Sequence, residues 1–257
     1  MANRKILMHV QYDGTQYNGW QIQPSGLTIQ GILQDCILRI TGEKAKVTGS
    51  SRTDSGVHAI EQIATFETSS TLSLDVVKRA LNAMLPEDIR IVKIREVWED
   101  LHARYSAERK RYVYMIANDS DIPVFLKRYV WWVKIPLNLD SMREASRSLL
   151  GTHDFSSFRG SGCGAKNTVR TIYSINLEKI DRVPFIFTEF KGNFIKVTIE
   201  ANAFLRHMVR NIVGTLVEVG KGRLSPEIIK KILYAKDRRL AGPTAPSKGL
   251  FLEKIYF

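Results

Sequence analysis

Residues 4–42 read RKILMHVQYDGTQYNGWQIQPSGLTIQGILQDCILRITG, and this stretch decides the class of fold. Residues 4–12 alternate between the two faces of a strand, and Asp13-Gly14 breaks the pattern. Thr28 is a typical N-cap, and Gly42 is typical of the end of a helix. Between them, apolar residues recur at helical spacing: Ile29, Ile32, Leu33, Cys36, Ile37 and Ile40. A strand followed by a helix with one apolar face predicts a sheet covered by helices.

The rest of the chain repeats this alternation. The first half continues with a strand at 63–67, a helix from Ser73 to near Pro86 and a strand at 89–97. The second half predicts strands at 110–116 and 169–177, paired strands at 185–190 and 194–200 about Gly192-Asn193, and helices at 140–150, 204–219 and from Ser225-Pro226. We therefore expect an α/β (α+β) protein with an N-terminal domain, 1–104, and a C-terminal domain, 105–257.

Composition excludes several classes of protein. The 257 residues contain no apolar run of eighteen, so no transmembrane helix is expected. The N-terminal residues lack the apolar stretch of a signal peptide. Cys36 and Cys163 are the only cysteines, too few for a disulfide framework, and Cys36 lies in an apolar helical stripe where we expect it to be buried. The five histidines show no metal-ligand spacing. A soluble, cytoplasmic protein without a metal site is the expectation.

The chain is strongly basic. It has 38 Lys and Arg against 26 Asp and Glu, which gives a formal net charge of +12. These residues are spread along the sequence rather than collected in a tail, which favours a folded surface that binds phosphates. A basic protein with no nucleic-acid partner is an equally good interpretation of charge alone.

The segment Arg52-Thr53-Asp54-Ser55-Gly56 is the most pointed candidate site. It sets a carboxylate beside a guanidinium in a tight loop. Asp54 is open to two interpretations from the residues alone: a turn former that bonds its own backbone, or a catalytic group. No second carboxylate lies close in sequence, so the paired-carboxylate chemistry of glycosidases is not supported.

Two further segments combine basic residues with rings or a helix. On the strand that contains Arg111-Tyr112, alternation sends Lys110, Tyr112 and Tyr114 to one face, where a ring could stack on a base or simply cover the sheet. On the predicted helix 204–219, Arg206 and Arg210 lie four residues apart. Asn211 and Gly214 among apolar residues indicate that this helix packs tightly while Arg210 points into a site.

An ordered set of motifs resembles the tRNA pseudouridine synthase A (TruA) family over nearly the whole chain. The motifs are Tyr12-Asp13-Gly14-Thr15 to Gly19-Trp20-Gln21, Gly31-Ile32-Leu33, Ser51 to Ala59 (SRTDSGVHA), Leu101 to Ala107 (LHARYSA), Arg111 to Tyr114 (RYVY), Gly151 to Phe155 (GTHDF), Phe204 to Gly214 (FLRHMVRNIVG) and Ala245 to Leu250 (APSKGL). Each motif alone is weak evidence, whereas the ordered set is specific.

The resemblance implies an isomerase that converts uridine to pseudouridine at positions 38, 39 and 40 of the tRNA anticodon arm. It implies two RNA-recognition-like (ferredoxin-like) domains whose antiparallel sheets join into one larger sheet, with the active-site cleft between the domains. It also implies a homodimer and no metal or organic cofactor.

The resemblance further assigns roles to six residues. Asp54 is implied as the nucleophile and Arg210 as its ionic partner. Tyr112 is implied to stack on the flipped base, and Arg52 to help extrude the uridine and fill its place. Arg104 is implied to hold the tRNA, and Leu250 to line the pocket. The residues leave open whether Asp54 attacks C1′ or removes a sugar proton.

Two other function classes are consistent with a basic α/β chain. One is a non-catalytic RNA-binding module that retained the fold. It is disfavoured because Asp54, Tyr112 and Arg210 are all present. The other is an RNA hydrolase or nuclease, which would need a metal cluster or a histidine pair, and the sequence shows neither.

Overall fold

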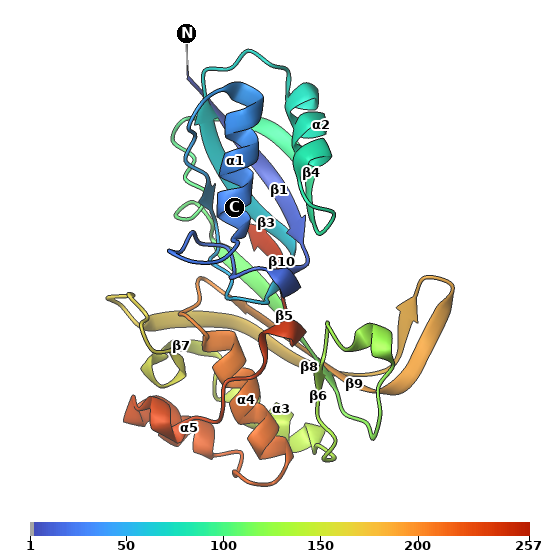
Figure 1. Ribbon diagram of the computed structural model, residues 1–257. Coiled ribbons are helices and arrows are strands. Elements are labelled where there is room, and N and C mark those ends of the chain that lie inside the picture. Colours follow the sequence, from blue (N-terminus) through green and yellow to red (C-terminus); the bar gives the residue numbers. More distant parts are fainter. Residues whose placement is uncertain (1–2) are drawn as a thin grey trace. The chain divides into compact units, whose positions relative to one another are not determined.

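The computed structural model describes residues 3–257, and its chain divides into two compact units. Unit 1 contains the chain up to Lys110 together with Phe251–Phe257, and unit 2 contains Arg111–Leu250. The chain therefore passes between the units twice. Both units combine strands and helices, so the predicted α/β class is confirmed (Figure 1). The boundary after residue 104 stays a prediction.

Unit 1 has the β-α-β-β-α-β order of RNA-recognition-like folds. Its elements are β1 (Arg4–Tyr12), α1 (Ile29–Thr41), β2 (Thr48–Gly49), β3 (His58–Thr68), α2 (Leu74–Met84) and β4 (Ile89–Val97). The antiparallel pairings give the spatial order β4-β1-β3-β2. Figure 1 shows α1 and α2 on the same side of these strands. Strand β10 (Leu250–Tyr256) adds a short parallel pairing, Phe251 and Leu252 with His58 and Ala59.

The sequence signals at both ends of α1 are confirmed. The Thr28 hydroxyl accepts the Gly31 N–H, and Gly42 adopts a φ of 76°. The apolar stripe of α1 packs on β1, where Ile6, Met8 and Val10 are fully buried. Cys36 is buried as predicted, and burial raises the pKa of its thiol. Local signals and packing agree throughout this stretch.

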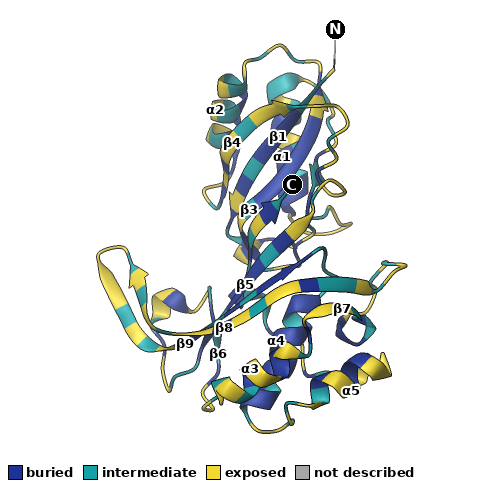
Figure 2. Cartoon of the chain, turned by 180° about the vertical axis from the view of Figure 1, so that it is seen from behind, coloured by how far each residue is buried: buried dark blue, intermediate teal, exposed yellow. Residues whose placement is uncertain are grey.

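Unit 2 contains β5 (Arg109–Ala117), whose first two residues belong to unit 1, and four further strands. These are β6 (Trp131–Trp132), β7 (Gly151–Asp154), β8 (Val169–Phe185) and β9 (Thr188–Ala201). The strand order is β5-β9-β8-β7, with β6 parallel to β5. The helices are α3 (Leu139–Arg147), α4 (Met208–Gly220) and α5 (Ile228–Ala235). Helix α4 is buried around most of its circumference, which is visible as dark blue in Figure 2.

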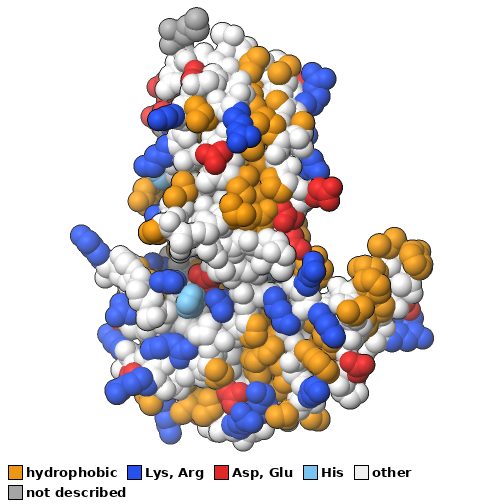
Figure 3. Space-filling model, viewed as in Figure 1, with side chains coloured by type: hydrophobic (Ala, Val, Ile, Leu, Met, Phe, Trp, Pro, Cys, Tyr) orange, Lys and Arg blue, Asp and Glu red, His pale blue; other side chains and the backbone are white. Residues whose placement is uncertain are grey.

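The predicted turn at Gly192-Asn193 is wrong. The hairpin turns at Ile186-Phe187, and its exposed end shows hydrophobic side chains in Figure 3. Gly192 and Asn193 lie inside β9, where the register with β8 shifts. The Asn118 N–H donates to the Asn193 carbonyl at 2.7 Å, and the Asn193 N–H donates to Asp119 at 3.2 Å. The glycine and asparagine therefore form an irregularity that docks a distant loop.

Two helix starts also differ from the sequence prediction. Helix α4 begins at Met208 rather than Phe204, because His207 has a φ of 61° that a right-handed helix cannot contain. Helix α5 begins at Ile228, beyond Ser225-Pro226, after a turn in which the Ile228 N–H bonds the Ser225 carbonyl. Short turns before a helix commonly shift its first residue in this way.

Candidate active site

The loop that carries Asp54 connects β2 to β3 in unit 1 and is held mainly through its backbone. The Trp20 N–H donates to the Thr53 carbonyl at 3.1 Å, and the Thr53 and Tyr12 hydroxyls lie 2.8 Å apart. The Gly56 N–H donates to the Tyr17 carbonyl at 3.2 Å. The loop residues on either side of Asp54 are therefore fixed by the segment that follows β1.

Glycines let that segment approach closely. Gly19 has a φ of 86°, and a Cβ on it would lie 2.4 Å from the Thr53 carbonyl oxygen. A Cβ on Gly14 would lie 2.0 Å from the Val57 carbonyl oxygen. Both obstacles are backbone atoms, which cannot move aside cheaply. The glycines of the Asp13-Gly14 and Gly19-Trp20 motifs thus serve the Asp54 loop.

Asp54 itself is half-buried, and Arg52 is exposed. The Val57 N–H donates to the Asp54 carbonyl at 3.2 Å, so the backbone of Asp54 forms a turn. That turn uses the backbone carbonyl of Asp54 and not its carboxylate. The turn and the catalytic interpretation are therefore compatible.

A contact that sequence reasoning missed holds the start of this loop. The Gln62 side chain, fully buried on β3, donates to the Ser51 carbonyl at 2.7 Å and accepts the Ser51 N–H at 3.1 Å. The sequence marks Gln62 only as a polar residue next to Glu61 in β3, and its partner depends on the register of β2 with β3.

Arg104 lies in the loop between β4 and β5, in the same unit as Asp54. Its side chain is exposed and stands over the Tyr105 ring, with the guanidinium carbon 5.9 Å from the ring centroid. The preceding residue, Ala103, is buried, and its carbonyl accepts a hydrogen bond from the Ser50 hydroxyl. The structure therefore ties the Arg104 loop to the first residue of the Asp54 loop.

Arg210, Tyr112 and Leu250 lie in unit 2. The Arg210 Nε donates to the Ala245 carbonyl at 2.7 Å, and the Ala245 N–H donates to the Arg210 carbonyl at 3.1 Å. The segment that leads to Leu250 thus lies against the first turn of α4. The Tyr114 hydroxyl donates to the Pro246 carbonyl at 2.7 Å and joins β5 to the same segment. Burial raises the pKa of Tyr114, while the charge of Arg210 acts to lower it.

Tight packing around α4 is confirmed. Asn211 is fully buried, and its side-chain amide donates to the Phe158 carbonyl at 2.7 Å. A Cβ on Gly214 would lie 1.7 Å from the Pro243 carbonyl oxygen. Tyr112, on the neighbouring β5, is buried and meets Phe204 edge to face at 5.1 Å between ring centroids. Neighbouring elements therefore fix the position of Arg210 on a rigid core helix.

The spacing of Arg206 and Arg210 predicts that they share one face of a helix, and this prediction is wrong. Arg206 precedes α4 and is exposed, and its guanidinium donates to the Ser161 carbonyl at 3.1 Å. A Cβ on Gly160 would lie 2.5 Å from the His207 ring, so the loop that contains Gly160, Gly162 and Gly164 packs directly on this non-helical segment.

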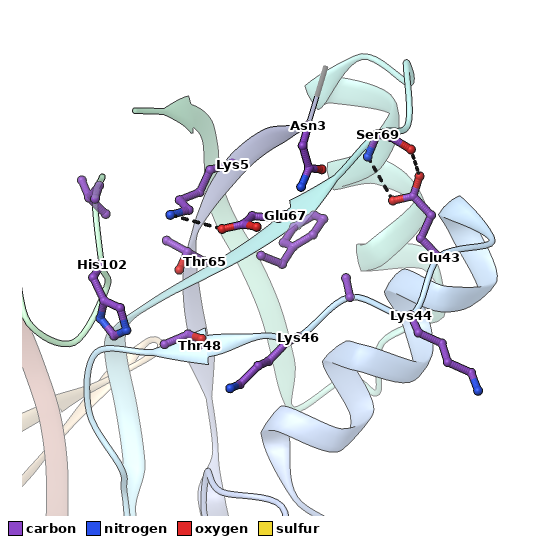
Figure 4. A pocket seen from close by; sticks show the side chains of 13 residues that line it. Asn3, Lys5, Glu43, Lys44, Lys46, Thr48, Thr65, Glu67, Ser69 and His102 are labelled. Atoms are coloured by element: carbon purple, nitrogen blue, oxygen red, sulfur yellow. Dashed lines mark hydrogen bonds and ion pairs between the residues drawn. The ribbon is translucent and has the colours of Figure 1, made fainter. Parts of the chain in front are cut away.

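A hollow of about 440 Å³ in unit 1 is separate from the predicted site residues. Figure 4 shows it beside β2 and β3, with Lys5 paired to Glu67 and Glu43 bonded to Ser69. None of the six predicted site residues lines it. Its lining mixes polar and apolar groups, and Lys44 and Lys46 lie on it as well.

The six predicted residues fall into two groups by unit. Asp54, Arg52 and Arg104 belong to unit 1, and Tyr112, Arg210 and Leu250 belong to unit 2. The pairing of Arg210 with Asp54 stays a prediction. Within residues 3–257, no three His, Cys, Asp or Glu side chains gather as a metal site would need. Over the same range, no helix has the length and apolar character to cross a membrane.

Comparison with known proteins identifies the family. A family model described as tRNA pseudouridine synthase matches residues 8–106 and 145–257. A relative named tRNA pseudouridine synthase A from Thermoanaerobacter sp. (strain X514) is 44% identical over 254 residues, which cover 99% of this chain and 100% of the relative. One of the same name from Thermodesulfovibrio yellowstonii is 43% identical over 252 residues, 98% of this chain and 99% of that protein.

Among solved structures, a chain of the archaeal box H/ACA sRNP Nop10-Cbf5 complex aligns with a TM-score of 0.32 and 14% identity, over 83% of this chain and 44% of that one. This likeness is too slight to carry an argument. The family match and the full-length relatives are decisive: the chain belongs to the tRNA pseudouridine synthase family.

Proposed function

We propose that this protein isomerises uridine to pseudouridine at positions 38, 39 and 40 of the tRNA anticodon arm. The observation that carries the proposal is the full-length similarity to proteins named tRNA pseudouridine synthase A. The packing of the Asp54 loop supports the proposal. Residues of the motifs that resemble the family all contact this loop: Tyr12, Gly14, Gly19 and Trp20. The net charge of +12 suits a polyanionic substrate.

The reaction breaks the bond from C1′ to N1 of the uracil and forms a bond from C1′ to C5. The base rotates between the two steps, the proton leaves C5, and N1 gains one. No electron is lost and no water is consumed overall, so the chemistry calls for no redox or hydrolytic cofactor. The enzyme must generate an anionic group at the sugar and hold the detached base in place.

In this proposal Asp54 is the anionic group, acting either on C1′ or on a sugar proton. Arg210 keeps the carboxylate ionised, because a guanidinium offsets the cost of shielding a charge from water. Its place on a tightly packed helix, with Nε held by Ala245, suits that task. Tyr112 stacks on the uracil, and Leu250 lines the pocket.

Arg52 and Arg104 act on the RNA. The exposed Arg52 helps to extrude the uridine and takes its place in the stack, which lowers the cost of flipping the base. Arg104, exposed on a loop tied to Ser50, holds a backbone phosphate. We further propose that the protein works as a cytoplasmic homodimer whose two copies both contact one tRNA.

The test uses purified protein and unmodified tRNA transcripts that carry uridine at only one of positions 38, 39 and 40. Pseudouridine is mapped after incubation, and we expect it at each of the three positions. Tight binding with no pseudouridine in any transcript would support a non-catalytic RNA-binding module instead. Strand cleavage would support a nuclease. In cells that lack the protein, the same positions should lose the modification.

A further inference from the structure

The Asp54 loop leaves the sheet at Ser51, whose backbone is bonded by the side chain of Gln62. Strand β2 pairs with β3 through Thr48 with Thr65 and Gly49 with Ala64, and the Ser50 N–H continues this ladder to the Ile63 carbonyl at 2.8 Å. The next pair, Ser51 opposite Gln62, would exchange no backbone hydrogen bond in a regular antiparallel ladder, because hydrogen-bonded and non-hydrogen-bonded pairs alternate. Here the carboxamide of Gln62 bonds both backbone groups of Ser51.

A carboxamide offers the same donor and acceptor as a peptide group, so Gln62 bonds the backbone of Ser51 as a neighbouring strand would. It holds Ser51 at the distance of a side chain from β3, and the chain diverges from the sheet there to reach Arg52 and Asp54. Further along β3, His58 and Ala59 pair with β10 instead. Gln62 therefore lies where the neighbour of β3 changes from β2 to β10, and the loop emerges through that opening.

The two halves of the Asp54 loop are held by different parts of the chain. Thr53 is fixed by Tyr12 and Trp20, and Gly56 is fixed by Tyr17. Between Ser50 and Thr53, the contact of Gln62 with Ser51 sets the path of the backbone that carries Arg52. Gln62 is fully buried, so water cannot replace either bond.

We propose that Gln62 is a positioning residue for the reaction: it sets the direction in which Arg52 leaves the sheet and, through Thr53, the placement of Asp54. This inference rests on the proposed roles of Arg52 and Asp54. In this proposal Gln62 does not touch the substrate and acts through the backbone of Ser51.

The experiment replaces Gln62→Met, which keeps the volume and removes both hydrogen bonds. Asn82→Leu is the matched control. The side-chain amide of Asn82 likewise bonds both backbone groups of one residue, Ile91, at 2.9 and 2.8 Å, in the same unit but on β4. Both variants lose two hydrogen bonds from a side-chain amide to the backbone of one residue, although Asn82 is only half-buried. A purely structural role predicts that the rate in each variant follows its loss of stability.

We expect both melting temperatures to fall, and that of Gln62→Met to fall further, because Gln62 is fully buried and Asn82 is half-buried. The single-turnover rate at saturating enzyme should fall on the order of 10- to 100-fold for Gln62→Met, because small misplacements of reacting groups have effects of that size. It should stay within about threefold of the parent for Asn82→Leu. Affinity for tRNA should change by less than about threefold in both, because phosphate contacts dominate binding.

Equal rates in the two variants would overturn the proposal, as would a loss of tRNA affinity that accounts for the whole effect of Gln62→Met. If that variant does not fold, Gln62→Asn keeps a buried amide but is too short to reach Ser51, and it must show the same selective loss of rate. Asp54→Asn is assayed in parallel. Full activity there would refute the proposed role of Asp54, separately from the comparison of Gln62 with Asn82.

Discussion

The two groups of candidate residues are held in different ways. Asp54 lies on a loop whose shape depends on hydrogen bonds and close approaches from four other parts of the chain: Tyr12–Trp20, Gln62, Ala103 and Lys110. Arg210 lies on the first turn of a buried helix, and the segment around Ala245 bonds its backbone and side chain. We infer that the loop is sensitive to changes in backbone contacts, whereas the arginine is sensitive to its own side-chain chemistry.

The largest expected effect comes from Asp54→Asn. Asn has nearly the same size, and the turn uses the backbone carbonyl of Asp54, so the loop should keep its shape. The amide cannot act as an anionic nucleophile or base, so the rate should fall by on the order of 1,000-fold or more. Tritium release from C5-labelled uridine in single-turnover assays measures it.

Asp100→Asn removes one exposed negative charge from the same unit and serves as the control. It should leave the rate unchanged. Activity of Asp54→Asn within tenfold of the parent would reduce Asp54 to a turn former. A joint collapse of folding and tRNA affinity would make its role structural.

Arg210→Lys tests the other side of the comparison. Lysine keeps the charge, but it cannot donate to Ala245 through Nε and also present a planar fork to a carboxylate. We expect turnover to fall on the order of 100-fold, in the range for loss of a preorganised electrostatic contact. Thermal unfolding should shift little.

Arg206→Lys is the matched control, since Arg206 is exposed and precedes the helix. It should retain the turnover of the parent. If Arg210→Lys also retained it, the proposed pairing of Arg210 with Asp54 would be wrong.

The sequence predicted the fold best where local signals suffice. Thr28 and Gly42 define α1 because the N-cap hydrogen bond and the left-handed glycine are properties of a few adjacent residues. Gly192-Asn193 misled because its backbone bonds Asn118 and Asp119, more than seventy residues away. The start of α4 was misplaced because the φ of His207 accompanies packing against Gly160.

The candidate site shows the same limit. Asp54 and Arg210 were found through motifs that resemble a family, since short contiguous patterns can be recognised in one sequence. Gln62 could not be found in that way, because its importance depends on facing Ser51 across two strands. A side chain that acts through the backbone of a distant residue leaves only a weak signal in the sequence, because Gln62 is one of several polar residues in β3.

A smaller effect is expected from Gly19→Ala. The φ of 86° alone costs about 1–2 kcal/mol for a residue with a Cβ. The Cβ would also lie 2.4 Å from the Thr53 carbonyl oxygen and 2.8 Å from the Asp54 carbonyl carbon. The loop must therefore shift, and we expect turnover to fall by about tenfold or more in addition to the loss of stability.

Gly42→Ala separates the two contributions. Gly42 has a similar φ of 76°, but a Cβ there meets nothing within 4 Å. It should lose about 1–2 kcal/mol of unfolding free energy and no turnover. Denaturant unfolding and single-turnover rates measure both quantities. Equal turnover in the two variants would show that the close approach of Gly19 has no bearing on the site.

The smallest effect is expected from Arg104→Ala, which tests whether the loop that contains Arg104 contacts the RNA. Binding of tRNA should weaken steeply with salt, because the basic residues displace counterions. If Arg104 contacts one phosphate, its removal should reduce the slope of log affinity against log salt by about one. Arg104→Lys keeps the charge and should restore the slope.

The single-turnover rate of Arg104→Ala at saturating enzyme should stay near that of the parent. The exposed Arg104 guanidinium bonds no residue of the Asp54 loop, and Ala103 rather than Arg104 anchors Ser50. An unchanged slope with unchanged affinity would remove Arg104 from the RNA interface. A large loss of rate would instead make Arg104 a positioning residue for the Asp54 loop, as proposed for Gln62.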